Sequence, residues 1–143
     1  MYEFGCHCKQ LTYCYSGQPY CCYICHCTDC QRASGAAFTS NLIVDTTDIS
    51  LVSGSAAEIC YSHNNDQLHV ICCQSCGTDL YLFFESRPAT ATILTGTFFQ
   101  HQWFSPIAHI WTQSSVPWLK LDDDLPCFKQ QPAWEDLTAL WKS

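Results

Sequence analysis

The apolar residues of this chain recur in short runs separated by turn-forming residues, which is the pattern of a β protein. Residues 11–15 alternate, so that one leucine and two tyrosines share one face of an extended strand. A turn at residues 16–19 leads into a second run at 20–24, and we expect the two runs to form a hairpin. Further runs of this kind lie at residues 38–44, 58–61, 68–72, 80–84, 91–94 and 107–111. Short strands at regular spacing predict a mainly β fold.

Two segments carry helix signals instead. Residues 28–34 end at Gly35, a typical stop for a helix. Residues 133–141 follow Pro132, and their apolar side chains recur at helical spacing, as Trp134, Leu137, Leu140 and Trp141. We interpret this tail as a strap on the protein's own core, with a homodimer contact as the alternative. The expected organisation is a single domain over residues 1–143 with short helices.

Length, composition and charge narrow the function classes. A chain of 143 residues with 48% hydrophobic residues can bury the core of one domain. The sequence shows neither an export signal nor an apolar run long enough for a bilayer, so we expect a cytoplasmic protein without membrane partners. Its formal net charge is −7 with only six Lys and Arg. Because nucleic acid is bound through a basic face, nucleic acid is not an expected partner.

The most specific signal is the spacing of the cysteines. Seven of the thirteen fall into three clusters, as Cys6 and Cys8, then Cys25, Cys27 and Cys30, then Cys73 and Cys76. Two cysteines with one or two residues between them can chelate one soft ion such as zinc from a single turn. A disulfide framework is the rival interpretation of so many cysteines. The odd count, the close spacings and the missing export signal favour metal ligands in a reducing compartment.

Seven ligands do not fill two tetrahedral sites. Four thiolates would close one structural site, and the remaining three would leave a second ion with an open position, the arrangement of catalytic zinc. The pair at 6 and 8 can join the pair at 73 and 76, but joining residues 27 and 30 would also make four. Cys22, Cys21 or His26 could supply a fourth ligand to the middle cluster.

The order of the motifs resembles a known family. Its members carry G-x-C-x-C, C-H-C-x-x-C and C-x-x-C-G in this order, followed by shorter segments. In this chain the matching stretches are Gly5 to Cys8, Cys25 to Cys30, Cys73 to Gly77, Gly96-Thr97, Pro106 to Ile110 and Pro117-Trp118. The chain thus resembles the family of the glutathione-dependent formaldehyde-activating enzyme and centromere protein V.

That resemblance implies a fold, a cofactor and an activity. The fold is an antiparallel β-tent, and two zinc ions per chain are expected. By the resemblance Cys6, Cys8, Cys73 and Cys76 hold a structural zinc, while Cys25, Cys27 and Cys30 hold a functional zinc. The implied activity is that of a carbon–sulfur lyase that joins formaldehyde to the thiol of glutathione. The alternative is a non-catalytic β module stapled by zinc, which binds a protein or a small ligand.

Several other residues are candidates for substrate binding. Arg32 and Ser34 follow the middle cluster and could hold an anionic group such as a glutathione carboxylate, although a solvated helix face explains them equally well. Trp103 and Phe104 flank a loop and could form a pocket wall. No catalytic residue is assigned beyond the cysteine trio.

The histidines near the clusters have structural interpretations. His7 and His26 each lie between two cysteines, so both side chains should point away from a metal that those cysteines share. His109 has apolar neighbours, and we expect a hydrogen-bonded core histidine.

Overall fold

The N-terminal alternation builds a three-stranded antiparallel sheet. In the computed structural model, which describes residues 1–143, β1 (Tyr2–Gly5) and β5 (Ile49–Ser53) pair with the two edges of β2 (Thr12–Tyr15). Phe4 of β1 is fully buried, and its ring lies 5.7 Å from the ring of Tyr13. Aromatic packing therefore holds this sheet on its inner face.

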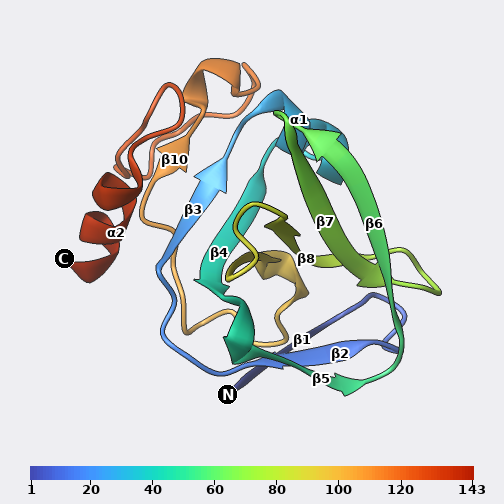
Figure 1. Cartoon of the computed structure of the whole chain (residues 1–143). Helices are drawn as coiled ribbons and strands as arrows, with labels where there is room; N and C mark the ends of the chain where they lie inside the picture. Colours follow the sequence, from blue (N-terminus) through green and yellow to red (C-terminus); the bar gives the residue numbers. More distant parts are fainter. The chain divides into compact units, whose positions relative to one another are not determined.

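The chain forms two compact units. The first comprises Met1–Pro19 and Ile43–Trp103, and the second comprises Tyr20–Leu42 and Phe104–Ser143. Besides the small sheet, the first unit contains a run of neighbouring antiparallel strands (Figure 1), which are β6 (Ala56–His63), β7 (Asp66–Cys73), β8 (Asp79–Phe84) and β9 (Thr90–Leu94). Short 3₁₀ turns at Thr46–Asp48 and Thr95–Thr97 belong to the same unit.

A tight turn sets the register of β6 against β7. Asn64 and Asn65 connect the strands, and both have positive φ angles, 49° and 62°. Two consecutive residues of this kind form the type I′ turn that matches the twist of a two-residue hairpin. His63 consequently pairs with Asp66, and the pairing continues to the far end of both strands.

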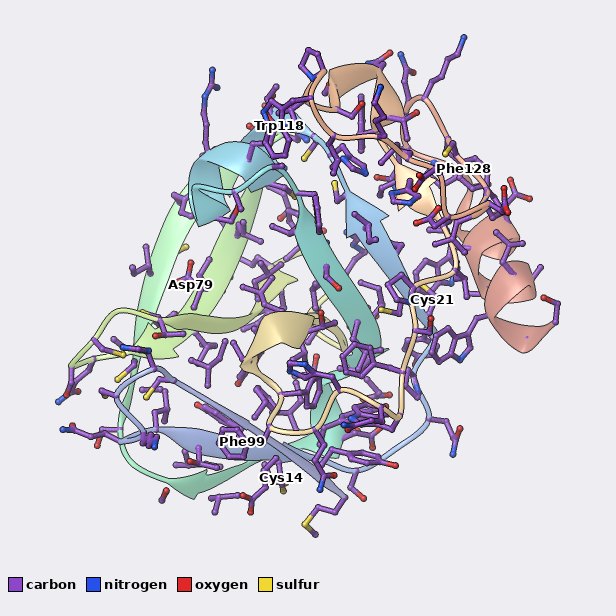
Figure 2. The ribbon with its side chains drawn as sticks, turned by 180° about the vertical axis from the view of Figure 1, so that it is seen from behind. Cys14, Cys21, Asp79, Phe99, Trp118 and Phe128 are labelled. Carbon is purple, nitrogen blue, oxygen red and sulfur yellow. The ribbon has the colours of Figure 1, made fainter.

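The second unit is built around β3 (Cys21–Cys25). It also contains α1 (Thr28–Ser34), the start of β4 (Thr39–Asp45), β10 (His109–Ile110), a 3₁₀ turn at Thr112–Ser114 and α2 (Trp134–Lys142). β10 runs parallel to β3. α2 packs against β3, and its Leu137 is buried. In Figure 2 the strand β3 can be found by the label of Cys21, its first residue. Trp134 contacts Tyr20 edge-on at 5.8 Å between ring centroids, so the tail helix lies on its own unit as the strap interpretation predicts.

The mainly β prediction is confirmed, as is the helix at residues 28–34. The predicted hairpin of residues 11–15 and 20–24 is wrong. Both edges of β2 are occupied, one by β1 and the other by β5, so β3 finds its partners elsewhere. The sequence did not indicate β5 because four of its five side chains are exposed, which removes the alternation. Neither helix has the length and apolar character needed to cross a membrane.

Candidate metal centres

Two tight turns bring four cysteines together in the first unit. Cys6 and Cys8 follow β1, where the N–H of Lys9 donates to the carbonyl of Cys6 at 3.2 Å. Cys73 ends β7, and the N–H of Gly77 donates to its carbonyl at 2.9 Å. Lys9 and Gly77 both have positive φ, at 69° and 77°, which lets each turn close on itself.

The sulfur atoms of this group have the spacing of a tetrahedral thiolate site. All four lie within 4.8 Å of one another, and the sulfur of Cys8 is 3.5 Å from that of Cys6 and 3.7 Å from that of Cys73. A zinc–sulfur distance of about 2.3 Å gives tetrahedral sulfur–sulfur edges of about 3.8 Å. The residues present therefore fit zinc, and the geometry groups residues 6 and 8 with 73 and 76 rather than with 27 and 30.

Hydrogen bonds surround the sulfur atoms of Cys73 and Cys76. The Cys73 sulfur accepts from the N–H groups of Ser75 at 3.4 Å and Cys76 at 3.5 Å. The Thr78 side chain, 3.1 Å from the Cys76 sulfur, lowers the pKa of that thiol to about 5. Thr78 follows the C-x-x-C-G motif directly and was not among the residues singled out from the sequence. Its position one residue after the glycine is the signal that could have found it.

The three middle cysteines meet at the junction of β3 and α1. Cys25 ends the strand, Cys27 caps the helix, and Cys30 lies in its first turn, where its N–H donates to the Cys27 sulfur at 3.3 Å. The three sulfur atoms lie within 4.8 Å of one another. Hydrogen bonds from the thiol of Cys25, and to a smaller extent from that of Cys30, lower the pKa of Cys27. The hydrogen bond to Cys27 in turn raises the pKa of Cys25. The pKa of Cys30 is raised as well, so Cys27 is the member of the trio that most readily becomes a thiolate.

No fourth donor joins the trio. Cys21, Cys22 and His26 all belong to the same part of the second unit, yet none is within the group of mutually close donor atoms. Cys21 and Cys22 are fully buried, and burial raises the pKa of each to about 12, which keeps them as neutral thiols. The trio thus offers three sulfur ligands. A tetrahedral ion bound there would have its fourth position open for water or a substrate.

His26 points into a buried hydrogen-bonded chain. Its Nε2 lies 2.8 Å from Nδ1 of His109, and Nε2 of His109 lies 2.8 Å from a carboxylate oxygen of Asp123. Burial lowers the pKa of His26, and the hydrogen bond from His109 lowers the pKa of Asp123. Because the carboxylate accepts, His109 donates from Nε2, and in a neutral His109 ring Nδ1 accepts from His26. Nδ1 of His26 is then left unprotonated, and it is buried without a hydrogen-bond partner.

The structure also shows how the trio's helix is attached. Nε2 of Gln31 donates to the carbonyl of His26 and to that of Ser114, both at 2.9 Å. Sequence reasoning missed Gln31, because a lone glutamine in a short helix carries no motif. It also did not single out Asp123, since nothing local marks a carboxylate that reaches a buried histidine.

The substrate candidates lie in different settings. Arg32 and Ser34 are exposed on α1, where the Ser34 hydroxyl donates to the carbonyl of Cys30 at 2.8 Å. Trp103 stacks on Tyr2 at 4.0 Å between ring centroids, with 6° between the ring planes, and so belongs to the aromatic packing of the first unit. Phe104 begins the last segment of the second unit and is half-buried. Their role in substrate binding stays a prediction.

The chain is similar to known proteins. The model of the family described as glutathione-dependent formaldehyde-activating enzyme matches residues 1–114. A crystal structure of a Rhodobacter sphaeroides protein is similar, with a TM-score of 0.54 and 12% identity over 88% of this chain and 98% of that chain. At this identity the likeness shows the fold alone. None of the curated proteins matches the chain.

Proposed function

The chain belongs to the glutathione-dependent formaldehyde-activating enzyme family, and on that premise we propose that it is a zinc-dependent enzyme of the carbon–sulfur lyase type. Its proposed substrates are a thiol such as glutathione and a small aldehyde such as formaldehyde. Formation of the adduct makes one bond between sulfur and carbon, and the thiol proton passes to the former carbonyl oxygen. Thiolate ligands require a reducing compartment, so we place the protein in the cytoplasm.

The observation that carries this proposal is the trio without a fourth donor. Cys25, Cys27 and Cys30 would hold the functional zinc, which when bound supplies an open position and lowers the pKa of a thiol placed there. The four-cysteine group would hold a structural zinc between the ends of β1 and β7. We therefore expect two zinc ions with different tasks.

The residues of the second unit prepare the trio for this role. Cys25 ends β3 and Cys27 caps α1, so both lie at the strand–helix junction. The side chain of Gln31 holds the helix there through its hydrogen bonds to the carbonyls of His26 and Ser114. Arg32 is exposed on α1 two residues after Cys30, where its cation can attract a carboxylate of the thiol substrate. Ser34 is the second candidate, although its hydroxyl already bonds the helix main chain.

The test is a rate measurement on protein that holds two zinc ions. Exchange NMR can follow formation of the adduct from formaldehyde and glutathione, against the uncatalysed rate. We expect acceleration by the wild type, loss of it in Cys27→Ser, and full retention in Cys127→Ser, which removes an exposed cysteine outside both groups. Equal rates with and without wild-type protein would overturn the proposed activity.

A second measurement separates the enzyme from the non-catalytic module. X-ray absorption counts the sulfur ligands of each ion, and the enzyme requires an average of about three and a half sulfurs over a four-sulfur and a three-sulfur site. An average of four would mean that both ions are closed, as in a purely structural module.

A further inference from the structure

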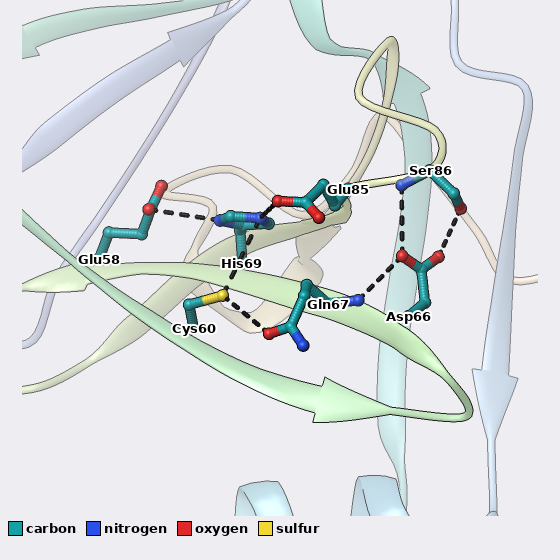
Figure 3. Close-up of polar contacts among 7 residues, drawn as sticks. All are labelled: Glu58, Cys60, Asp66, Gln67, His69, Glu85 and Ser86. Carbon is teal, nitrogen blue, oxygen red and sulfur yellow. Dashed lines mark hydrogen bonds and ion pairs between the residues drawn. The ribbon is translucent and has the colours of Figure 1, made fainter.

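A thiol, an imidazole and two carboxylates meet on one face of β6, β7 and β8, outside both cysteine groups (Figure 3). The antiparallel register places Cys60 opposite His69, and His69 opposite Phe83. Glu58 lies two residues before Cys60, and Glu85 two residues after Phe83. Because side chains alternate between the faces of a strand, both glutamates flank the same face, with the histidine at the centre.

The histidine ring is held from several sides. Its Nδ1 lies 3.3 Å from a carboxylate oxygen of Glu58, and its Nε2 lies 3.4 Å from one of Glu85 and 4.0 Å from the sulfur of Cys60. Phe83 stacks on it at 4.8 Å between centroids with 3° between the planes. The Glu58 and Glu85 side chains are 49% and 65% exposed, so an ion from solvent can reach the cluster.

The charge of the cluster favours a cation. Two carboxylates face one imidazole, so the group carries net negative charge whether or not the ring is protonated. Hydrogen bonding to Glu58 first, and then to Glu85, raises the pKa of His69. A proton thus partly offsets the carboxylates, and a divalent ion would offset them fully.

We propose that Cys60, His69 and Glu85 form a third metal site, which binds a divalent ion of the zinc type. A tetrahedral zinc ion sets nitrogen–sulfur edges of about 3.5 Å and nitrogen–oxygen edges of about 3.4 Å. The observed separations from Nε2 are 4.0 Å to sulfur and 3.4 Å to oxygen. The three donor atoms do not all lie within 4.8 Å of one another, so binding of the ion requires the Glu85 side chain, which is 65% exposed, to turn toward the sulfur and close the third edge.

Glu58 completes the arrangement from behind the ring. A histidine that ligates a metal through one nitrogen usually donates its other N–H to a carboxylate, which orients the ring and strengthens the ligand. The contact of Nδ1 with Glu58 is of this kind and leaves Nε2 directed at the thiol and at Glu85. Glu58 is therefore a positioning residue here.

The proposed site should bind its metal ion more weakly than the cysteine groups bind theirs. It has one thiolate where the others have three or four, and two of its ligands, Cys60 and Glu85, are exposed at the surface. We expect it to fill last and to exchange its ion readily. Since Cys60 lies on β6, His69 on β7 and Glu85 directly after β8, a bound ion would cross-link β6, β7 and the end of β8. This site does not depend on the activity proposed above.

Cobalt(II) can test the site in protein whose cysteine groups are first loaded with zinc. Added cobalt should bind at one equivalent and show the near-ultraviolet charge-transfer band of a cobalt–thiolate bond. Cys60→Ser should abolish that band, and His69→Asn should weaken binding at least tenfold. Cys127→Ser removes the other exposed cysteine that lies outside both cysteine groups, whose thiol is near the carbonyl of Leu125, and should leave the titration unchanged.

Each variant must retain two zinc ions before cobalt is added. Glu85→Gln, which changes only an exposed side chain, serves as a second variant and should weaken cobalt binding about tenfold while the thiolate band remains. A wild type that binds no third ion, or a band that persists in Cys60→Ser, overturns the proposal. Neither result bears on adduct formation at the trio, so the two proposals fail separately.

Discussion

Nε2 of His26 lies 2.8 Å from Nδ1 of His109, and both rings are buried although 83 residues separate them. Asp123 closes the chain by accepting from the far nitrogen of His109. The acidic residue lies beyond residue 114, where the family match ends. A segment outside that match thus bonds to His109, and only through His109 is it linked to the histidine that stands between two cysteines of the trio.

The first prediction concerns His109, the central residue of this hydrogen-bonded chain. His109→Leu removes the acceptor of His26 and leaves a buried N–H without a partner. The free energy of unfolding should fall by about 1–3 kcal/mol, which is the usual penalty for an unsatisfied buried group. Urea unfolding of the zinc-loaded protein measures it.

His7→Asn is the matched control, because His7 also lies between two cysteines but is exposed. Its effect should stay within about 0.5 kcal/mol. Equal losses in both variants would show that the hydrogen-bonded chain contributes nothing specific to stability.

The second prediction concerns Asp123 and pH. Its pKa in the folded protein is lowered from 3.8, chiefly by the hydrogen bond from His109. The unfolded chain therefore binds more protons between the two pKa values, and stability is lost as the pH falls through the folded value. The side chain is 47% exposed, so solvent screening limits this contribution to about 1 kcal/mol or less.

Asp123→Asn isolates that contribution. The difference in unfolding free energy between wild type and variant should be constant from pH 7 to about pH 4 and shrink below it. Metal loss in acid affects both proteins alike and cancels in the difference. A difference that grows on acidification would contradict the assignment.

The third prediction concerns the turn that carries Cys73 and Cys76. Gly77 has a φ of 77°, and a Cβ added there would meet no atom within 4 Å. Gly77→Ala should therefore cost about 1–2 kcal/mol through backbone strain alone. Because the turn presents two of the four sulfurs, zinc affinity of this group should fall about tenfold, as measured by competition with a chelator.

Gly96→Ala provides the comparison. That glycine also has open space around its missing side chain, but it has no positive φ. The substitution should leave zinc affinity and stability unchanged. If Gly77→Ala were equally silent, the strained turn would not be what shapes the four-cysteine group.

Local features could be predicted because their physics is local. Cysteines two or three residues apart reach one point in space whatever the rest of the chain does, so the clusters were visible as chelates. The helix at residues 28–34 was equally visible, since Gly35 takes the left-handed conformation with φ of 69° that ends a helix. The pairing of the first strands could not be predicted in this way. Residues 11–15 were expected to pair with residues 20–24, but β2 pairs with β1 and β5.

The sequence by itself determined the mainly β class, the three cysteine clusters and the family. Only the tertiary structure brought the first and third cysteine clusters together into one four-sulfur group and left the middle cluster without a fourth donor. The hydrogen bond between His26 and His109 also depends on it. The tertiary structure likewise decided that Cys60 on β6 lies opposite His69 on the neighbouring strand β7. Each of these depends on the register of strands or loops distant in sequence, and many long-range pairings share the same apolar pattern. Only the packed chain selects among them.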